Sequence, residues 1–583
     1  MNQPFAVIGT LNSKYIHSSL APWCLLAGLA AYSAAPDAAV VVEGTINEPL
    51  QDVAQRIARH SPRLVGLSCY IWNITATLEL VALLKEQLPQ VVVVLGGPEV
   101  SYRAAALLEQ YPPVDYIIAG EGEQPFAQLA DALMRGRSPH GLPGLCYRGP
   151  QGPVATPPHT PRQQPPSPYT DAYLRAVKGR IAYLETSRGC PYSCAFCLSG
   201  RCGGVRFFDV EQAKNHLTAI ANSGARTIKL VDRTFNAHRK RAKELFAFII
   251  ANHGRLWPED VAFHFEIAGD ILDGETLDLL ATAPPGAIQL EVGLQSFNSD
   301  TLERIHRKTD TTRLTDNLRC LIGAGNMHIH IDLIAGLPGE DWPSLARSFD
   351  IAYGLRPHML QFGFLKLLHG APMREDPAAY PCSYDPLPPY EVRQTPWLTA
   401  EQLEELHHLE DALERLYNSG RFRRTLEYLL VQTGLPPFEL FYRFGLFAAS
   451  QGSVRPMLDD YTALVFNYFR EQPGVDPRVL RDVMLCDRLA TNASGRLPPV
   501  LYEGDPAIKK ARMALDAKAE TRRPPGLRRG LALLYASGEV AYADYDKKHP
   551  VTGEYPLQRL PLDAVLHPGA EAKGQPSPED ARN

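Results

Sequence analysis

Short apolar runs alternate with helix-length segments between residue 1 and about residue 145, and a second alternation begins near Ile181. A parallel strand that is buried on both faces of a sheet shows such a near-continuous run of Val, Ile and Leu. Neighbouring parallel strands need a long crossover connection, which is usually a helix. The pattern therefore predicts two successive α/β domains. A chain of 583 residues has room for about three or four domains of ordinary size.

The first alternation, over residues 1–148, predicts an open, doubly wound sheet of the Rossmann-like kind. Its expected strands are Phe5–Gly9, Ala39–Glu43, Leu64–Ser68, Val91–Leu95 and Tyr116–Ala119. Ligands of such sheets bind beyond the carboxyl ends of the strands. Small and polar residues follow four of the expected strands, namely Thr10-Leu11-Asn12, Ser68-Cys69-Tyr70, Gly96-Gly97-Pro98-Glu99 and Gly120-Glu121-Gly122-Glu123. We therefore predict a ligand crevice at this edge of the sheet.

The remainder of the chain divides by composition and periodicity. Residues 149–177 are rich in proline, which cannot continue a helix or a central strand, and they are predicted to form a linker. Residues 178–375 hold six strand–helix repeats and are predicted to form a (β/α)6 partial TIM barrel. Residues 385–565 are expected to be mainly helical, and residues 566–583 are expected to be a disordered tail. The expected barrel strands are Ile181–Glu185, Thr227–Val231, Phe263–Ile267, Ile288–Val292, His328–Leu333 and Met359–Leu365.

Composition excludes several classes of protein. Hydrophobic residues make up 45% and charged residues 21% of the chain, which are ordinary values for a folded protein. The formal net charge of −5 gives no whole-chain indication of nucleic-acid binding. No apolar run approaches the roughly 18 residues that a membrane span needs, and the N-terminus lacks the pattern of a signal peptide. Ten cysteines are too few for a disulfide scaffold, so we expect a cytoplasmic protein whose thiols are ligands or buried apolar groups.

The cysteines with the most informative spacing are Cys190, Cys194 and Cys197, which form C-x3-C-x2-C at the end of the first expected barrel strand. Three thiolates on one tight loop can converge on a single metal centre. A structural zinc site normally takes four protein ligands, and no second Cys or His pair supplies them, although Cys202 is a weak candidate. A [4Fe–4S] cluster usually takes four cysteines, so three of them leave one iron open to bind another molecule. Zinc and a buried group of apolar thiols remain as alternatives.

The motif C-x3-C-x-aromatic-C, followed by six strand–helix repeats, resembles the radical S-adenosylmethionine (SAM) superfamily. The resemblance implies that the open iron chelates SAM, which one electron cleaves to methionine and a 5′-deoxyadenosyl radical. The segments Leu230–Asn236, Glu291–Ser296 and Asp332–Glu340, the last with its Gly-Leu-Pro-Gly turn, look like the second, fourth and fifth strand regions of that family. The first of these departs from the Gly-Gly-Glu pattern of many members. The SAM contacts that the resemblance implies are Phe196, Asp232, Gln295, Ser296 and Asp332.

A doubly wound domain before such a barrel resembles the cobalamin-binding subclass. Gly96–Glu99 and Asp115–Glu123 match the fourth- and fifth-strand motifs of that subclass. The cobalamin contacts so implied are Asn12, Ser68, Gly96, Gly97, Glu99, Glu121, Gly122 and Glu123. The Asp-x-His-x-x-Gly motif is absent, and His17 lies in a different context, so we expect no protein His on cobalt. Asn12–Leu20 and Leu387–Val392 also resemble a bacterial group that carries a C-terminal domain of unknown function, DUF4080-like.

The two implied cofactors favour methylation of an unactivated carbon of a small-molecule or peptide substrate. Such a reaction needs an external electron donor such as flavodoxin or ferredoxin. One alternative is a radical rearrangement, cyclisation or oxidation without methyl transfer, and another is a non-catalytic iron–sulfur sensor. A methylthio-transferring tRNA enzyme would carry three further cysteines for a second cluster. Cys24, Cys69 and Cys146 are too widely spaced to favour that reading.

Overall fold

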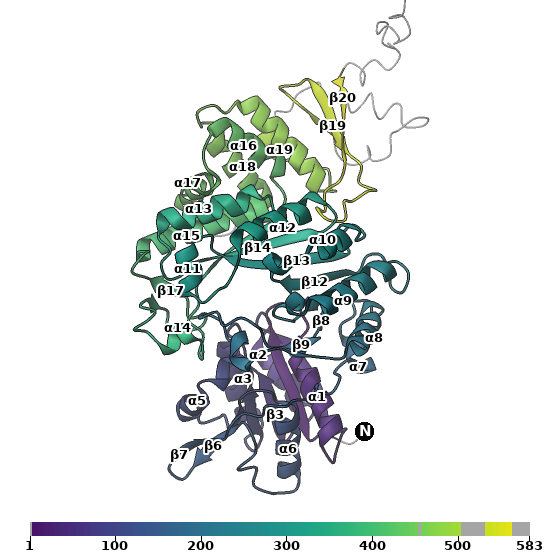
Figure 1. Cartoon of the computed structure of the whole chain (residues 1–583), viewed down its shortest axis with the longest axis vertical. Helices are drawn as coiled ribbons and strands as arrows, with labels where there is room; N and C mark the ends of the chain where they lie inside the picture. Colours follow the sequence, from purple (N-terminus) through teal and green to yellow (C-terminus); the bar gives the residue numbers. More distant parts are fainter. Residues whose placement is uncertain (1–2, 453–455, 503–530, 563–583) are drawn as a thin grey trace, which may run out of the picture. The chain divides into compact units, whose positions relative to one another are not determined.

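The structure is a computed structural model that describes residues 3–452, 456–502 and 531–562 (Figure 1). It divides into two compact units. The first contains Met1–Leu345 and Gly363–Ala400, and the second contains Ala346–Phe362 and Glu401–Asn583. The first unit therefore holds the first predicted α/β domain and most of the second, whose segment Ala346–Phe362 is assigned to the second unit. The predicted tail, residues 566–583, lies outside the described residues.

The N-terminal sheet has the strand order β2-β1-β3-β4-β5-β6-β7. Its parallel strands are β1 (Ala6–Asn12), β2 (Ala39–Thr45), β3 (Leu64–Ser68), β4 (Val92–Gly96) and β5 (Tyr116–Ile118). The order changes direction between β1 and β3, which is the switch point at which doubly wound sheets bind ligands. The predicted Rossmann-like architecture is therefore confirmed, with β1 running three residues further than expected.

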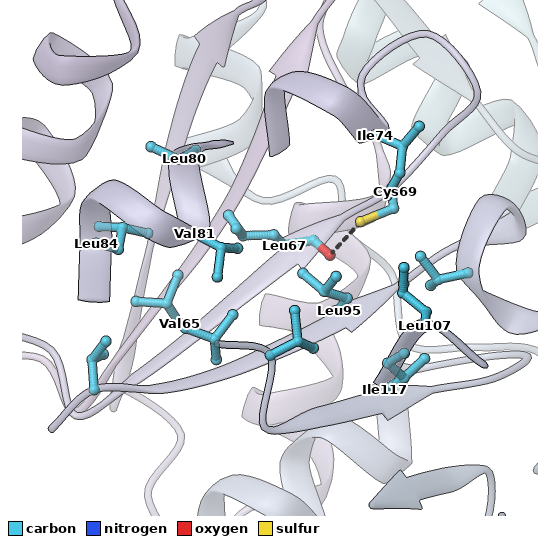
Figure 2. Close-up of a cluster of buried hydrophobic side chains, with 14 of the residues drawn as sticks. Val65, Leu67, Cys69, Ile74, Leu80, Val81, Leu84, Leu95, Leu107 and Ile117 are labelled. Atoms are coloured by element: carbon cyan, nitrogen blue, oxygen red, sulfur yellow. Dashed lines mark hydrogen bonds between the residues drawn. The ribbon is translucent and has the colours of Figure 1, made fainter. Parts of the chain in front are cut away.

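Helices cover both faces of this sheet because neighbouring side chains of a strand point to opposite faces. Val7 and Val65 pack with α2, α3 and α5, as Figure 2 shows for part of that cluster. Ala6 and Leu64 pack on the other face with α1 and α6, where the fully buried Phe126 contributes about 1.5–3 kcal/mol. The helices are α1 (Ala21–Tyr32), α2 (Leu50–Ala58), α3 (Ile74–Gln87), α4 (Pro98–Ser101), α5 (Ala104–Gln110) and α6 (Glu123–Met134).

The predicted linker, residues 149–177, contains regular structure that its prolines had seemed to exclude. β6 (Leu145–Gly149) and β7 (Gly152–Ala155) add an antiparallel hairpin to the sheet. β7 tolerates Pro153 because it is the edge strand, where a missing N–H can face outward. The short helix α7 (Asp171–Ala176) follows, with Thr170 as its N-cap and the fully buried Tyr173 as its anchor.

The predicted six-stranded partial barrel is confirmed, with the strand order β15-β14-β13-β12-β11-β8. Its strands are β8 (Ile181–Leu184), β11 (Thr227–Leu230), β12 (Ala262–Ile267), β13 (Ile288–Gln295), β14 (His328–Ala335) and β15 (Met359–Phe364). The pairs from β8 to β14 are parallel. The intervening helices are α8 (Val210–Ala221), α9 (Arg239–Asn252), α10 (Gly274–Ala281), α11 (Ser299–Arg304), α12 (Thr311–Gly323) and α13 (Trp342–Gly354). A small hairpin, β9 (Ser187–Arg188) with β10 (Arg206–Phe207), frames the loop that carries the three cysteines.

The first unit ends with α14 (Pro372–Glu375) and an antiparallel pair, β16 (Ser383–Tyr384) with β17 (Val392–Gln394). The helices that follow are α15 (Ala400–Leu413), α16 (Arg423–Thr433), α17 (Pro437–Ser450), α18 (Leu458–Phe469) and α19 (Pro477–Thr491). The buried carboxylate of Asp487 accepts hydrogen bonds from the backbone and hydroxyl of Thr425 and so joins α19 to α16. A three-stranded antiparallel sheet follows, with β18 (Leu531–Leu533), β19 (Glu539–Ala543) and β20 (Leu557–Pro561). The mainly helical prediction is thus confirmed, and no described helix has the length and apolar character of a membrane span.

Candidate cofactor site

Cys190, Cys194 and Cys197 line one cavity of about 170 Å³ in the first unit, and all three thiols are free. The cavity opens where the barrel strands end, because Thr234, Ala268 and Gln295 lie at or just beyond the carboxyl ends of their strands. Active sites of such barrels sit at this edge. Its lining residues are Cys190, Tyr192, Cys194, Phe196, Cys197, Ser199, Gly200, Arg233, Thr234, Glu266, Ile267, Ala268, Glu291, Gly293, Gln295, Arg307 and Asp332. The arrangement suits a metal cluster with one further molecule beside it.

The chain that enters the cysteine loop is anchored by a buried carboxylate. Asp232, only 1% exposed, accepts hydrogen bonds from the backbone N–H of Thr186 at 2.9 Å and from its hydroxyl at 2.7 Å. Asp232 also accepts from Ser187, while Arg241 donates to the Thr186 hydroxyl. Asp232 is absent from the cavity lining. The predicted SAM contact is therefore not placed at the cavity, because this side chain is used to hold the loop in position.

Three of the predicted SAM contacts, Phe196, Gln295 and Asp332, do line the cavity. Ser296 does not, since it is fully buried and donates a 2.6 Å hydrogen bond to Glu340 Oε1. Neighbouring residues of an extended chain point to opposite faces, so Gln295 and Ser296 cannot both face the same cavity. The register shift between Gly293 and Gln295, where Gln295 takes a φ of 76°, turns the Gln side chain inward.

A cation that sequence reasoning missed lies beside the cysteines. Arg307 follows α11, and its Nη1 is 3.8 Å from the Sγ of Cys194. Its guanidinium stacks over the ring of Tyr192 at 5.3 Å, and it donates to the Gly293 carbonyl. Burial raises the pKa of the Cys194 thiol, and the positive charge of Arg307 acts against that rise. Such a cation favours the thiolate form that binds metal. No local motif signals this contact, which joins residues 113 positions apart.

Charged side chains continue from the cavity into the barrel. Glu291 Oε2 accepts from His264 Nε2 at 2.8 Å and from Lys229 Nζ at 3.0 Å, while His330 Nε2 lies 2.8 Å from Asp332 Oδ1. Burial acts to raise the pKa of Glu291, but the hydrogen bond from His264 and the charges of Lys229 and His330 outweigh it and lower the value to about 2. Glu291, His330 and Asp332 could together hold a metal ion, but Lys229 already provides the positive charge at this point. We interpret the group as an ion-pair network.

We expect Glu291→Gln to destabilise the barrel at pH 7 and to do so less in acid. The pKa of Glu291 falls on folding from its usual value of 4.5 to about 2. Its stabilisation is therefore complete above pH 4.5 and is lost as the pH falls toward 2, with a size of up to about 3 kcal/mol. Urea unfolding of the cluster-free protein at pH 7 and pH 3 measures this. We expect the difference in the free energy of unfolding between wild type and variant at pH 3 to be less than half of that at pH 7. An equal difference at both pH values would contradict the lowered pKa of Glu291.

At the N-terminal domain, four predicted cobalamin contacts lie at the carboxyl ends of the strands. Asn12 ends β1, Ser68 ends β3, and Gly96 with Gly97 ends β4. Gly97 has a φ of 108°, and a Cβ at this position would lie 2.5 Å from the carbonyl oxygen of Cys69. The backbone at Gly97 therefore approaches the backbone at Cys69 more closely than a residue with a Cβ would permit.

The three predicted acidic contacts are instead paired within the protein. Glu99 accepts a 2.5 Å hydrogen bond from the Tyr390 hydroxyl and lies 2.7 Å from Arg103. Glu121 and Glu123 both pair with Arg188 of the barrel domain. Gly122, between them, packs against Leu25 and caps α6 through its carbonyl. Tyr390 and Arg188 lie far from these carboxylates in the sequence, so the family motif does not reveal their contacts.

The carboxyl end of β3 carries an aromatic pair that sequence reasoning did not single out. Trp72 is 51% exposed and stacks on Tyr70 with ring centroids 4.4 Å apart. The exposed flat ring of Trp72 and the strand end without a side chain at Gly97 each suit a flat macrocycle such as a corrin. His17 is held elsewhere, because its Nδ1 lies 2.8 Å from the Tyr183 hydroxyl of β8. The residues at these strand ends therefore fit a bound cobalamin.

Comparison with protein families gives three matches along the chain. Residues 8–130 match the B12 binding domain, residues 184–351 match the radical SAM superfamily, and residues 378–528 match a protein family of unknown function, DUF4080. The matches follow the order of the predicted and observed domains.

Comparison with individual proteins points in the same direction. The chain is 30% identical over 318 residues to the cobalamin-dependent radical SAM methyltransferase TokK from Streptomyces tokunonensis, covering 52% of this chain and 45% of TokK. It is 29% identical to 2-(S-pantetheinyl)-carbapenam-3-carboxylate methyltransferase from Streptantibioticus cattleyicolor, covering 54% of this chain and 49% of that enzyme. The chain thus spans about half the length of these curated relatives.

Among solved structures, the radical SAM methyltransferase TsrM from Kitasatospora setae, with cobalamin and a [4Fe-4S] cluster bound, superposes with a TM-score of 0.52. The match covers 64% of this chain and 74% of TsrM at 21% identity, so it supports the fold alone. Together with the family matches and the geometry of the cavity, these findings identify the architecture. Residues 184–351 form a radical SAM domain, with a B12-binding domain before it and a DUF4080 region after it.

Proposed function

We propose that this protein methylates an unactivated carbon of a small-molecule or peptide substrate, using SAM, a [4Fe–4S] cluster and cobalamin. The observation that carries the proposal is one cavity that combines three cysteines with carboxylates at the barrel strand ends. Beside it, a B12-binding domain is ion-paired directly to the cysteine loop. When bound, the cofactors supply a carbon-centred radical and a methyl group. The chain binds, orients and shields them.

The cavity offers partners for each part of SAM. The three thiolates would hold a [4Fe–4S] cluster and leave one of its irons free to bind SAM. Carboxylates from three strands, Glu266, Glu291 and Asp332, suit the cationic groups of that ligand. Gln295 offers an amide to its hydroxyls, and Phe196 offers a ring surface to its adenine. Arg307 balances the negative charge of the thiolates.

Radical SAM chemistry requires an external reductant, for which we propose a flavodoxin or a ferredoxin as the class of partner. Such donors, and the reduced thiols that the cluster needs, are available in the cytoplasm. The DUF4080 region, over residues 378–528, is a candidate for substrate selection.

The proposal predicts two SAM-derived products from the anaerobically reconstituted full-length protein. With a chemical reductant, hydroxocobalamin and SAM, we expect S-adenosylhomocysteine together with methylcobalamin, and 5′-deoxyadenosine from reductive cleavage. S-adenosylhomocysteine should disappear when cobalamin is omitted. Liquid chromatography with mass spectrometry measures all three compounds.

The other outcomes separate the competing functions. Formation of 5′-deoxyadenosine alone, with cobalamin bound, indicates rearrangement, cyclisation or oxidation and contradicts methyl transfer. Failure to cleave SAM at all, with an intact cluster, indicates an iron–sulfur sensor. A cobalamin-to-protein ratio near zero after gel filtration indicates that the N-terminal domain does not bind cobalamin and has only a structural role.

A further inference from the structure

Arg188 lies two residues before the first cysteine of the cluster loop and joins three carboxylates. Its Nε and Nη2 bind Glu185 at 2.8 and 2.9 Å, in the forked geometry that matches a guanidinium to a carboxylate. Its Nη1 lies 2.5 Å from Glu121, and Nη2 lies 2.6 Å from Glu123. Four hydrogen bonds from the Arg188 guanidinium are therefore donated to these three carboxylates.

Two of these carboxylates come from the other domain. Glu121 lies in the loop after β5 and Glu123 begins α6, at the edge of the sheet where we place the cobalamin. Glu121 is also bound by Arg206 at 2.7 and 2.9 Å, and Arg206 pairs with Arg188 across the β9–β10 hairpin. The hairpin that frames the cysteine loop thus holds the cobalamin-side loop with two guanidinium groups.

Burial makes this cluster costly to rearrange. The Arg188 side chain is 18% exposed and that of Glu123 is 9% exposed. Removing one partner of a buried pair leaves an uncompensated charge, so the remaining groups keep their places only while the whole cluster is intact. The planar guanidinium also fixes directions, which a lysine ammonium does not.

Other contacts hold the same two domains together without touching the cysteine loop. Arg180 lies 2.7 Å from Glu43, and the Ser18 hydroxyl donates a 2.8 Å hydrogen bond to the Ile181 carbonyl of β8. Loss of Arg188 is therefore expected to leave the two domains associated. The distance between the cysteine loop and the loop that carries Glu121 would then no longer be fixed.

We propose that Arg188 is a positioning residue that sets the distance and orientation between the cluster loop and the cobalamin loop, with Glu121 and Glu123 as its partners. This inference rests on the proposed function. Methyl transfer from SAM to cobalamin depends on that spacing, whereas reductive cleavage of SAM takes place on the barrel side alone. A misplacement of about 1 Å can cost about 100-fold in rate. Arg188 thus affects the two reactions unequally.

The experiment compares full-length, anaerobically reconstituted wild type with Arg188→Lys, Glu121→Gln and Glu123→Gln. We expect methylcobalamin formation from SAM and reduced cobalamin to fall by at least about tenfold, while 5′-deoxyadenosine formation changes by less than about twofold. Cluster content and cobalamin stoichiometry should be unchanged. A second readout is independent of turnover, namely the relaxation enhancement of the cob(II)alamin paramagnetic resonance signal by the reduced cluster. We expect this enhancement to weaken or become heterogeneous in the variants.

Arg319→Lys is the matched control, because Arg319 pairs with Asp316 on the surface of α12 and both side chains are about two-thirds exposed. It should behave as wild type. A parallel loss of both reactions, or unchanged methylcobalamin formation and spin relaxation in Arg188→Lys, overturns the inference alone. Wild-type protein that binds no cobalamin overturns the proposed function and the inference with it. Wild type that binds cobalamin but forms no methylcobalamin overturns methyl transfer, and the spin relaxation then decides the inference.

Discussion

Replacing any one of Cys190, Cys194 or Cys197 by Ala is expected to abolish both the visible absorption of the iron–sulfur cluster and all cleavage of SAM. Each thiol is one of the three proposed ligands, and among the described residues that line the cavity no further thiol can replace it. With two ligands left, a cluster has no stable attachment and no ordered open iron. Absorption spectroscopy, iron content and assay of 5′-deoxyadenosine after anaerobic reconstitution measure the loss.

Cys320→Ala serves as the control, since Cys320 is exposed on α12, outside the cavity lining. It should retain the cluster and the cleavage of SAM. Retained 5′-deoxyadenosine formation in any of the three motif variants would contradict the assignment of the ligands.

Gly97→Ala is expected to lower cobalamin affinity by at least about tenfold while the cluster still assembles. Gly97 has φ 108° and ψ 172°, a region that essentially only glycine occupies, at a cost of about 1–3 kcal/mol for other residues. Its added Cβ would also lie 2.5 Å from the Cys69 carbonyl oxygen. The loop must therefore shift at the strand end where we place the corrin. Hydroxocobalamin titration followed by gel filtration measures the binding.

The N-terminal domain provides a matched control in Gly141→Ala. Gly141 also has a positive φ, 92°, but nothing lies within 4 Å of a Cβ built there. Gly141→Ala therefore introduces backbone strain but no steric clash of the kind expected at Gly97. Equal cobalamin affinity of Gly97→Ala and wild type would contradict the placement of Gly97 in the cobalamin-binding crevice.

Periodicity predicted the architecture well because burial acts on every strand in the same way. The predicted Leu64–Ser68 coincides with β3, and the six barrel strands all appear, since a strand covered on both faces must be apolar throughout. Proline content misled at Pro153, because the rule against proline in sheets applies to central strands and β7 is an edge.

The candidate site was predictable only as far as local motifs reach. The three cysteines are spaced within one loop, so their convergence could be read from the chain. Asp232 and Ser296 were assigned by family position, but burial and strand alternation turn them toward Thr186 and Glu340. Arg307 gives no sequence signal because its contacts with the cysteine loop are long-range.

The same limit applies to the cobalamin side. Gly97 was predictable because close approach of backbone requires glycine at a strand end. Glu99, Glu121 and Glu123 were named as ligand contacts because of the family resemblance. Glu99 pairs with the nearby Arg103, whereas Glu121 and Glu123 pair with Arg188, which lies far along the chain. Ion pairs between domains depend on the docking of the two α/β parts, about which spacing within one domain carries no information.

The central claim is that three thiolates hold a four-iron cluster whose fourth iron binds SAM. Mössbauer spectroscopy of the wild-type protein, reconstituted anaerobically with isotopically enriched iron, tests it most directly. The account predicts a [4Fe–4S] spectrum in which the signal of one iron site changes when SAM is added. Protein that holds a single zinc ion, or a cluster whose iron sites all remain unchanged on addition of SAM, would contradict it.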